Sequence, residues 1–427
     1  MKVKTGVSYR EVLNKSPKKV KKPSRPSFLL GTLIRVISLP DLWATKFKFK
    51  SIGMEKLGKR EPCFILMNHS SFIDLKIASR LLYPRKYNII MTLDGFVGKD
   101  WLMRHIGCIP TRKFVSDVKL IHDMMYAVKR YNSSILMYPE ASYSFDGTAT
   151  PLPESLGRCI KMMDLPVVMI KTEGAFTRDP LYNNLQTRQV EVSATIEYLL
   201  SPDEIKEKKS SEINALLKDR FTFDNFRWQK DNGVEVDEPF RADSLNRVLY
   251  KCPECLTEGE THGEGITLTC KACGKVYEMQ TDGSMKALEG KTEFSHIPDW
   301  YKWERECVRK EIEDGTYSLD VEVNICAMVD TDCIYDLGDG RLTHNKEGFH
   351  LTGCDGELDY TQKPLASYSL YADYFWYKLG DIICIGNNDI LYYCFPKGDR
   401  DVVAKTRLAT EELYKIIRSE KRTRNAE

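Results

Sequence analysis

Between residues 63 and 198 short apolar runs alternate with helical stretches, and this alternation constrains the fold more than any other feature of the sequence. Strands and helices in this order form the sheets of α/β proteins, which carry helices on both faces. Helices are expected at residues 72–82 and 115–130. Strands are expected at residues 63–67, 87–91, 134–138, 167–171 and 190–198. The sequence therefore predicts an α/β domain.

After Gly315 the pattern changes to short alternating or aromatic segments, which indicate strands. Turns are expected at residues 338–340 and 386–388, and residues 401–422 form an amphipathic helical pattern. Seven or so strands closed by one helix resemble the pleckstrin-homology-like superfold in the order of their elements. The sequence thus predicts a β-rich domain with a C-terminal helix, preceded by a linker helix within residues 291–314.

Four of the 13 cysteines form two C-x2-C pairs, Cys252 with Cys255 and Cys270 with Cys273. Two such pairs at this separation can close four thiolates around a zinc ion, and the segment resembles a zinc ribbon. Four ligands leave no open position, so a structural Zn²⁺ is expected. The alternatives are four unrelated thiols or a redox pair, although neither pair opens a helix after a βαβ strand, as thioredoxin-like motifs do.

The first 60 residues carry 16 Lys and Arg against three acidic residues. No apolar signal segment is expected in residues 1–22, and a reducing, cytoplasmic environment is inferred. An apolar helix is expected within residues 26–40, and it is too short to cross the roughly 30 Å hydrocarbon core of a lipid bilayer. With basic residues and Trp43 around it, this helix suits an interfacial anchor on anionic lipids. The alternative is a helix packed on its own domain.

Residues 68–74, Asn-His-Ser-Ser-Phe-Ile-Asp, lie where an expected strand meets a helix. His69 and Asp74 would be about 140° apart on one helix, so His69 must precede the helix. If a serine caps the helix and His69 folds back, Asp74 can hold one ring nitrogen while the other takes a proton from a hydroxyl. In the alternative interpretation, Ser71 and Asp74 form a capping-box-like helix start and His69 is incidental.

Three further blocks follow in order, at residues 107–113, 135–144 and 165–170. With residues 68–74, they resemble the four motif blocks of the glycerolipid acyltransferase superfamily, which includes lysophosphatidate and glycerol-3-phosphate acyltransferases. The resemblance covers roughly residues 30–200. It implies an acyltransferase-type mixed sheet with flanking helices. It also implies O-acyl transfer from acyl-CoA or acyl carrier protein to a glycerolipid hydroxyl, without a covalent acyl-enzyme.

The resemblance also implies roles for individual residues. His69 would act as the base and Asp74 as its orienting partner. Arg112 would contact the acceptor phosphate, assisted by Lys113. Glu140 would lie near the polar backbone of the acceptor; alternatively, it binds local backbone amides at the end of a strand.

The block around Glu140 departs from the family pattern at one position. The family usually has Pro-Glu-Gly-Thr-Arg-Ser, whereas residues 139–144 read Pro-Glu-Ala-Ser-Tyr-Ser. Ser142 and Tyr143 are expected to contact substrate, but Tyr143 offers a phosphate only a neutral hydroxyl in place of a guanidinium. The expected lysophospholipid acceptor, 1-acylglycerol-3-phosphate, is therefore the part of the prediction that most needs a test.

These features together predict a cytoplasmic acyltransferase, peripheral on the inner face of a membrane. One alternative is a non-catalytic lipid-binding scaffold. Another is a zinc-ribbon nucleic-acid-binding protein, but residues 252–273 hold four acids and one lysine and would repel phosphate, so no nucleic acid is expected. The expected segments are a basic flexible arm (1–25), an interfacial membrane-anchor helix region (26–50), an acyltransferase domain (51–236), a zinc ribbon (237–290), a linker helix (291–314) and a β-rich, pleckstrin-homology-like domain with a C-terminal helix (315–427).

Overall fold

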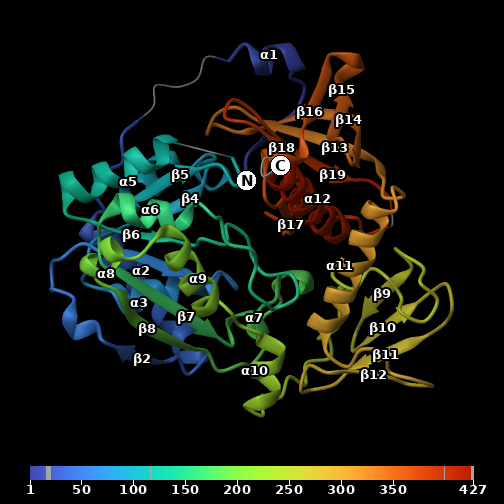
Figure 1. The fold of residues 1–427 in the computed structure, drawn as a ribbon, viewed down its shortest axis with the longest axis horizontal. Helices are drawn as coiled ribbons and strands as arrows, with labels where there is room; N and C mark the ends of the chain where they lie inside the picture. The colour runs from blue at the N-terminus through green and yellow to red at the C-terminus, as the bar shows by residue number, and fades with distance from the viewer. Residues whose placement is uncertain (16–20, 116–117, 399, 425–427) are drawn as a thin grey trace. The chain divides into compact units, whose positions relative to one another are not determined.

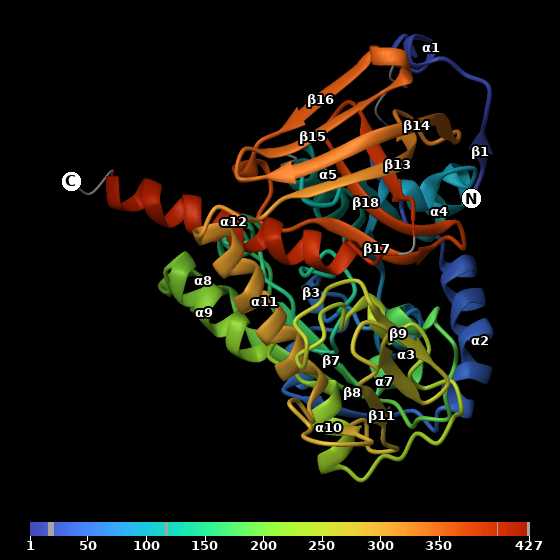
Figure 2. The same cartoon turned by 90° about the vertical axis from the view of Figure 1, so that its right-hand side faces the viewer.

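The computed structural model describes residues 1–15, 21–115, 118–398 and 400–424, and it divides into two compact units. The α/β unit comprises Lys19–Pro180 and Leu185–Asp231. The β-rich unit comprises Met1–Lys18, Leu181–Asn184 and Asn232–Glu427. Figures 1 and 2 show the elements of both units. The finer division into six segments stays a prediction.

The α/β unit is built on a seven-stranded sheet in the order β2-β8-β7-β3-β6-β4-β5. The five strands from β7 to β5 are parallel to one another, whereas β8 is antiparallel to β7. The predicted mixed α/β fold is therefore confirmed. The strands are β2 (Lys48–Ile52), β3 (Phe64–Met67), β4 (Tyr87–Thr92), β5 (Cys108–Thr111), β6 (Ser134–Met137), β7 (Val167–Glu173) and β8 (Ser193–Leu200).

Side chains of β3 alternate between two hydrophobic cores, one on each face of the sheet. Ile65 and Met67 pack with apolar residues of α2 and α3, whereas Phe64 and Leu66 pack with those of α5, α6 and α9. A central strand that is covered on both faces reads as a continuous apolar run. The helices of this unit are α2 (Phe28–Ala44), α3 (Ile73–Leu82), α4 (Asp100–Ile106), α5 (Val118–Tyr131), α6 (Leu156–Met163), α7 (Ala175–Arg178), α8 (Pro202–Glu207), α9 (Ser210–Arg220) and α10 (Asn225–Asp231).

Two edge strands, β2 and β5, have no counterpart among the strands predicted from the sequence. Every residue of β2 is exposed, and its lysines alternate with Phe49 and Ser51, a composition that protects an edge from further pairing. Strand β5 has four residues, including Pro110, which cannot donate to a ladder. Neither segment carries the apolar signal of a buried strand.

The β-rich unit contains seven antiparallel strands in the order β16-β15-β14-β13-β19-β18-β17, followed by α12. Figure 2 shows α12 beside these strands and α11. The strands are β13 (Leu319–Met328), β14 (Ile334–Asn345), β15 (Gly348–Gly353), β16 (Leu358–Gln362), β17 (Tyr371–Trp376), β18 (Gly380–Gly386) and β19 (Leu391–Pro396), and the helices are α11 (Ile297–Glu313) and α12 (Val403–Arg424).

The turn predicted at residues 338–340 is wrong, because these residues lie inside β14. The register of β13 against β14 shifts between Ile325 and Cys326, opposite this segment. A Cβ at Gly340 would lie 2.3 Å from Ile325 Cδ1 and 2.4 Å from the Thr352 carbonyl oxygen. Gly340 is therefore required by the close approach of the neighbouring strands and not by a chain reversal.

The four paired cysteines lie beside a small four-stranded sheet in the order β12-β11-β10-β9: one pair precedes β9, and the other spans the end of β10 and the turn after it. This sheet packs on α11, whose Trp300 and Glu304 are fully buried. Trp300 Nε1 donates to the carbonyl oxygen of Lys251, and the amide of Lys251 donates to Glu304. The segment predicted as a linker helix is thus part of the core. The strands are β9 (Thr261–Glu264), β10 (Thr267–Cys270), β11 (Val276–Met279) and β12 (Met285–Ala287).

The N-terminal segment differs from the predicted flexible arm. Strand β1 (Val3–Lys4) pairs with the start of β14, and helix α1 (Tyr9–Leu13) buries Val12 completely. Tyr9 Oη lies 2.6 Å from Tyr392 Oη. The short helix α1 packs through Val12, one apolar residue in a lysine-rich stretch. The overall composition of residues 1–25 gave no sign of this contact. Residues 16–20 of the predicted arm, and residues 116–117 of a predicted helix, lie outside the described residues.

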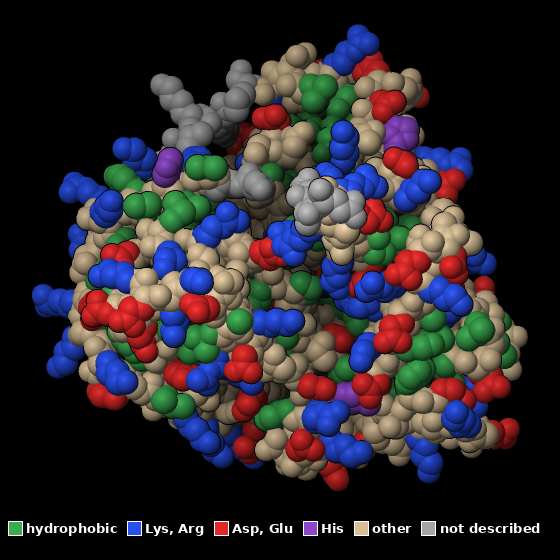
Figure 3. Space-filling model, in the orientation of Figure 1, with side chains coloured by type: hydrophobic (Ala, Val, Ile, Leu, Met, Phe, Trp, Pro, Cys, Tyr) green, Lys and Arg blue, Asp and Glu red, His purple; other side chains and the backbone are tan. Residues whose placement is uncertain are grey.

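No helix in the described ranges is long and apolar enough to cross a membrane. Helix α2, which the sequence predicted as a membrane anchor, is apolar but has only 17 residues, with Pro40 near its C-terminal end. On the face drawn in Figure 3, basic and acidic side chains are interspersed.

Candidate functional site

The predicted site residues follow three parallel strands at one edge of the α/β sheet. His69 follows β3, Arg112 and Lys113 follow β5, and residues 140–143 follow β6. Parallel strands bring their carboxyl ends to the same edge, which is where open α/β sheets bind ligands. Strands β3 and β6 are direct neighbours, so the His69 and Glu140 segments meet there.

His69 precedes α3 and is held by Asp74 in the first turn of that helix. The Nδ1 atom of His69 lies 3.2 Å from Asp74 Oδ2. The same oxygen accepts hydrogen bonds from the amides of Ser70 (2.7 Å) and Ser71 (3.0 Å). Asp74 is 1% exposed, whereas the side chain of His69 is 20% exposed. With a carboxylate as its acceptor, Nδ1 carries the proton and Nε2 is free to accept one.

The two interpretations of this segment are combined in the structure. Asp74 accepts from the amide of Ser71, as the capping-box-like alternative expects, and it also contacts the His69 ring; the N-cap residue of α3 is Phe72, without a side-chain cap. The hydroxyl oxygen of Ser71 accepts from the amide of Ile73, the first residue of α3. The same carboxylate therefore contacts both the His69 ring and the backbone just before α3.

Glu140 binds backbone amides from two separate segments. Its Oε2 accepts from the amide of His69 (2.9 Å), and its Oε1 accepts from the amide of Thr150 (3.0 Å). Glu140 is 1% exposed, and burial raises its pKa to about 7 although both amides act to lower it. These contacts fit the backbone-binding alternative, and its predicted contact with the acceptor stays a prediction.

Aromatic rings lie against the imidazole of His69. The ring of Tyr143 stacks on it with centroids 4.0 Å apart, and the ring of Tyr138 does so at 4.2 Å. Ser142, next to Tyr143, is buried. The sequence predicted Tyr143 as a site residue but gave no signal for Tyr138.

Burial is the main influence on the protonation of His69, and it lowers the pKa of the imidazole below its ordinary value. Asp74 acts in the opposite direction, and the positive charge of Lys113 lowers the pKa further. Lys113 is therefore close enough to affect His69, and Arg112 precedes it in the chain; both are partly exposed. A neutral imidazole with one free nitrogen can act as a general base.

Sequence reasoning missed two polar residues that support the site. Thr172, in β7, donates from its amide to Asn68 Oδ1, and its hydroxyl lies 3.4 Å from Asp74 Oδ1. Asp179, after α7, accepts a hydrogen bond from the Ser71 side chain, and burial raises its pKa to about 6. Both come from strand or helix ends about 100 residues further along the chain, where local motifs give no signal.

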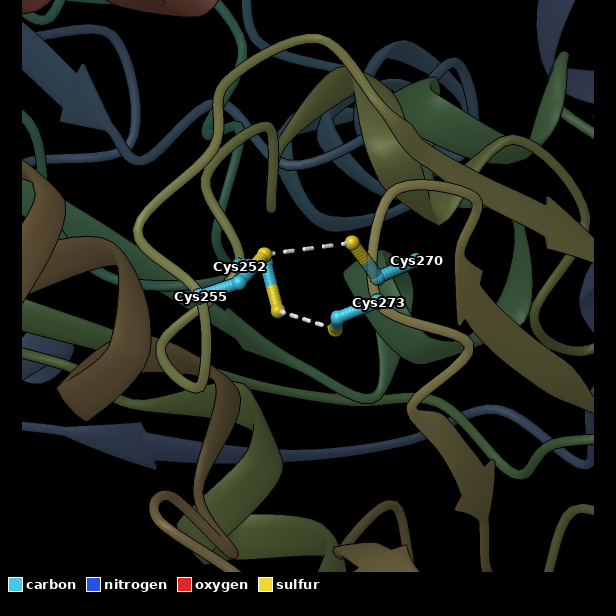
Figure 4. A group of neighbouring side chains, drawn as sticks. All are labelled: Cys252, Cys255, Cys270 and Cys273. Atoms are coloured by element: carbon cyan, nitrogen blue, oxygen red, sulfur yellow. Dashed lines mark hydrogen bonds between the residues drawn. The ribbon is translucent and has the colours of Figure 1, made fainter.

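A second candidate site lies in the β-rich unit, where the four paired cysteines converge. Their sulfur atoms all lie within 4.8 Å of one another. The distance is 3.8 Å from Cys252 to Cys273 and 3.7 Å from Cys255 to Cys270. Figure 4 shows the four side chains pointing toward one another from two loops. Zn–S bonds of about 2.3 Å in a tetrahedron separate the sulfurs by about 3.8 Å, so the residues fit a closed metal site.

Residues 48–171 match the family model described as Acyltransferase. This segment lies within the α/β unit and contains every candidate active-site residue from His69 to Tyr143. Among solved structures, the chain is similar to the 1-acyl-sn-glycerophosphate (LPA) acyltransferase PlsC from Thermotoga maritima, with 15% identity over 45% of this chain and 78% of that chain. The TM-score of 0.34 is too low to define a shared fold. No curated protein matches the sequence.

Proposed function

We propose that the protein is an O-acyltransferase that moves a fatty acyl group from acyl-CoA or acyl carrier protein to a glycerolipid hydroxyl, with 1-acylglycerol-3-phosphate as the first candidate acceptor. The observation that carries the proposal is the His69–Asp74 pair, with Nε2 of the imidazole free, inside the segment that matches the acyltransferase family. The reaction is a step of phospholipid synthesis or remodelling.

In this reaction His69 Nε2 removes the proton from the acceptor hydroxyl as the hydroxyl oxygen attacks the thioester carbonyl carbon. A C–O bond forms and the C–S bond breaks, so the thiol leaves and takes the proton back from the imidazolium. Asp74 stabilises the imidazolium that forms between these events. Backbone amides stabilise the oxyanion.

Arg112 and Lys113 bind the phosphate of the acceptor in this proposal, with Ser142 and Tyr143 beside it. A guanidinium fork suits a phosphate, and both basic residues follow β5 at the sheet edge that carries His69. Glu140 contributes indirectly, since it holds the amide of His69.

Helix α2 seats the α/β unit on the inner face of a membrane, and the protein is cytoplasmic and peripheral. One face of α2 carries the apolar residues Phe28, Leu29, Leu33, Val36 and Ile37, each between 51% and 79% exposed. At about 100° per residue these positions span about half of the helix circumference, which makes one broad stripe. A stripe of this kind next to lysines 46, 48 and 50 suits a surface of anionic lipids.

The β-rich unit holds a structural zinc ion on Cys252, Cys255, Cys270 and Cys273, in a zinc ribbon. Its seven strands and C-terminal helix form a pleckstrin-homology-like domain. The close approach of the four sulfur atoms supports the zinc site. The strand order supports the pleckstrin-homology-like domain, because strands β13 to β16 form one meander and strands β17 to β19 form a second.

An acyl-transfer assay tests the proposed function. Purified protein is incubated with radiolabelled acyl thioester and a panel of acceptors, both phosphorylated and unphosphorylated, beside His69→Ala. We expect product from 1-acylglycerol-3-phosphate that depends on His69. Product from unphosphorylated acceptors alone would contradict the acceptor assignment. No product from any acceptor, with vesicle binding intact, would favour a lipid-binding scaffold.

A further inference from the structure

Both faces of the His69 imidazole are covered by tyrosine rings. The planes of Tyr138 and Tyr143 make angles of 29° and 30° with the imidazole, at centroid distances of 4.2 and 4.0 Å. Two rings stacked this closely cannot share one face of an imidazole, so they lie on opposite faces. His69 is therefore sandwiched between them.

A single stretch of chain supplies both rings. Tyr138 directly follows β6, and the amide of Ala141 donates to the carbonyl oxygen of Tyr138 in a turn whose Ala141 has φ of +57°. This reversal brings Tyr143 back to the other face of the imidazole. Phe72 packs edge-on against Tyr143, with centroids 5.8 Å apart.

The remaining sides of His69 are also occupied, apart from one. Asp74 binds Nδ1 and Glu140 accepts from the backbone amide. Lys113 is the cationic group that acts on the ring. With both faces and the Nδ1 edge in contact with protein, the Nε2 edge is the direction from which a substrate hydroxyl can approach.

We propose that Tyr138 and Tyr143 are positioning residues, which clamp the imidazole of His69 so that Nε2 points to the acceptor hydroxyl. This inference rests on the proposed acyl transfer, in which His69 is the base. A ring held on two faces cannot rotate about its Cβ–Cγ bond, so the productive orientation is set before the acceptor binds. The two rings also exclude water from the imidazole, and this burial lowers its pKa.

Removing one ring should therefore have two measurable effects. In Tyr143→Ala, one face of the imidazole becomes exposed to water, so the pKa of His69 rises toward its ordinary value. The imidazole also gains freedom to rotate, so kcat falls by about 10-fold or more, in addition to any rise in KM from a lost acceptor contact. Tyr143→Phe keeps the ring and should keep the pKa of His69.

The test is an NMR titration of the full-length protein labelled with ¹³C at histidine Cε1. The chain has seven histidines, and the His69 signal is the one lost in His69→Gln. Wild type, Tyr143→Ala, Tyr143→Leu and Tyr143→Phe are titrated together, because leucine fills the space of the ring without stacking if alanine disturbs the fold. Tyr126→Ala is the matched control, since Tyr126 lies in α5 and packs on Tyr131.

A raised His69 pKa in Tyr143→Ala and Tyr143→Leu, with no change in Tyr143→Phe and Tyr126→Ala, supports the clamp. An unchanged pKa in both truncated variants would overturn it, as would an equal shift in Tyr143→Phe. The titration does not need turnover. If acyl transfer is absent for every acceptor, the proposed function falls, while the titration still decides whether the rings enclose His69.

Discussion

Asp74 combines two tasks in one buried carboxylate. From the first turn of α3 it accepts from two consecutive amides, and it holds the Nδ1 side of His69. Amide donors stabilise the charged form of a carboxylate, so Asp74 can offset the charge of an imidazolium without moving. The short segment from residue 68 to residue 74 therefore holds both the proposed base and its proposed orienting group.

Asp74→Asn should lower kcat by roughly 10²- to 10⁴-fold, because an amide keeps the shape but cannot offset the imidazolium charge. Initial rates of acyl transfer at saturating substrate measure this. Asp100→Asn is the matched control, since Asp100 pairs with Lys21 and Arg104 and not with a histidine. Equal rates for wild type and Asp74→Asn would remove the orienting role.

The pH dependence of kcat/KM should report the lowered pKa of His69. Since burial lowers that pKa, the imidazole stays neutral at pH 7 and takes up a proton only in more acidic solution. We therefore expect full activity at neutral pH and an acid limb centred below about 6.5, the ordinary histidine value. Rates between pH 4.5 and pH 9 check this.

A limb at or above pH 6.5 would contradict the assignment to His69. Glu140, with a pKa of about 7, and Asp179, with a pKa of about 6, also titrate nearby. A limb near pH 7 that disappears in Glu140→Gln would belong to Glu140 instead.

At the scale of elements, buried strands were predictable and edge strands were not. The apolar runs of β3, β6 and β7 mark central strands, because both of their faces are covered. Edge strand β2 has no such run, and Gly340 of β14 suggested a turn where the close approach of neighbouring strands in fact requires a glycine. Both differences arise from pairing between distant segments, which local patterns do not contain.

The candidate site shows the same limit at close range. The His69–Asp74 pair and the four cysteines depend on spacing along the chain, so the sequence was sufficient to select them. Tyr138 and Thr172 contact this pair only because β6 and β7 both lie beside β3. The contacts of Tyr138 and Thr172 therefore depend on the order of strands in the sheet, which cannot be derived from the spacing of motifs along the chain.

Helix α2 yields a prediction for membrane binding. Leu33→Glu combined with Ile37→Glu places two charges on its exposed apolar stripe, and should reduce binding to phosphatidylcholine vesicles containing phosphatidylglycerol by about 10-fold or more. Vesicle co-flotation measures the bound fraction. Leu288→Glu is the control, because Leu288 is 57% exposed but lies in the β-rich unit. Unchanged flotation of the α2 variant would leave α2 as an ordinary surface helix.

At the scale of the whole molecule, the four-cysteine segment is part of the core of the β-rich unit and not an appendage. Lys251, next to Cys252, bonds through its backbone to Trp300 and Glu304 of α11. Its ammonium group pairs with Glu258 and Glu311, which also pair with Lys405 of α12. A change at the cysteines should therefore reach both helices.

Removing zinc should destabilise the β-rich unit and leave the α/β unit folded. Cys252→Ser or a strong chelator should remove one zinc per chain and lower the melting temperature of that unit by about 10 °C or more. Elemental analysis measures the metal, and hydrogen–deuterium exchange should show lost protection in residues 245–313 but not in residues 63–92. Cys354→Ser, outside the cluster, is the control. Full zinc content in Cys252→Ser would contradict the assigned ligands.

The central claim is that His69 is the base of an acyl transfer. The most direct measurement is the rate of transfer from labelled acyl-CoA to 1-acylglycerol-3-phosphate in vesicles, for wild type and His69→Ala at equal zinc content and equal vesicle binding. The account predicts product with wild type and a rate at least 10³-fold lower with the variant. Equal product from the two proteins would contradict it.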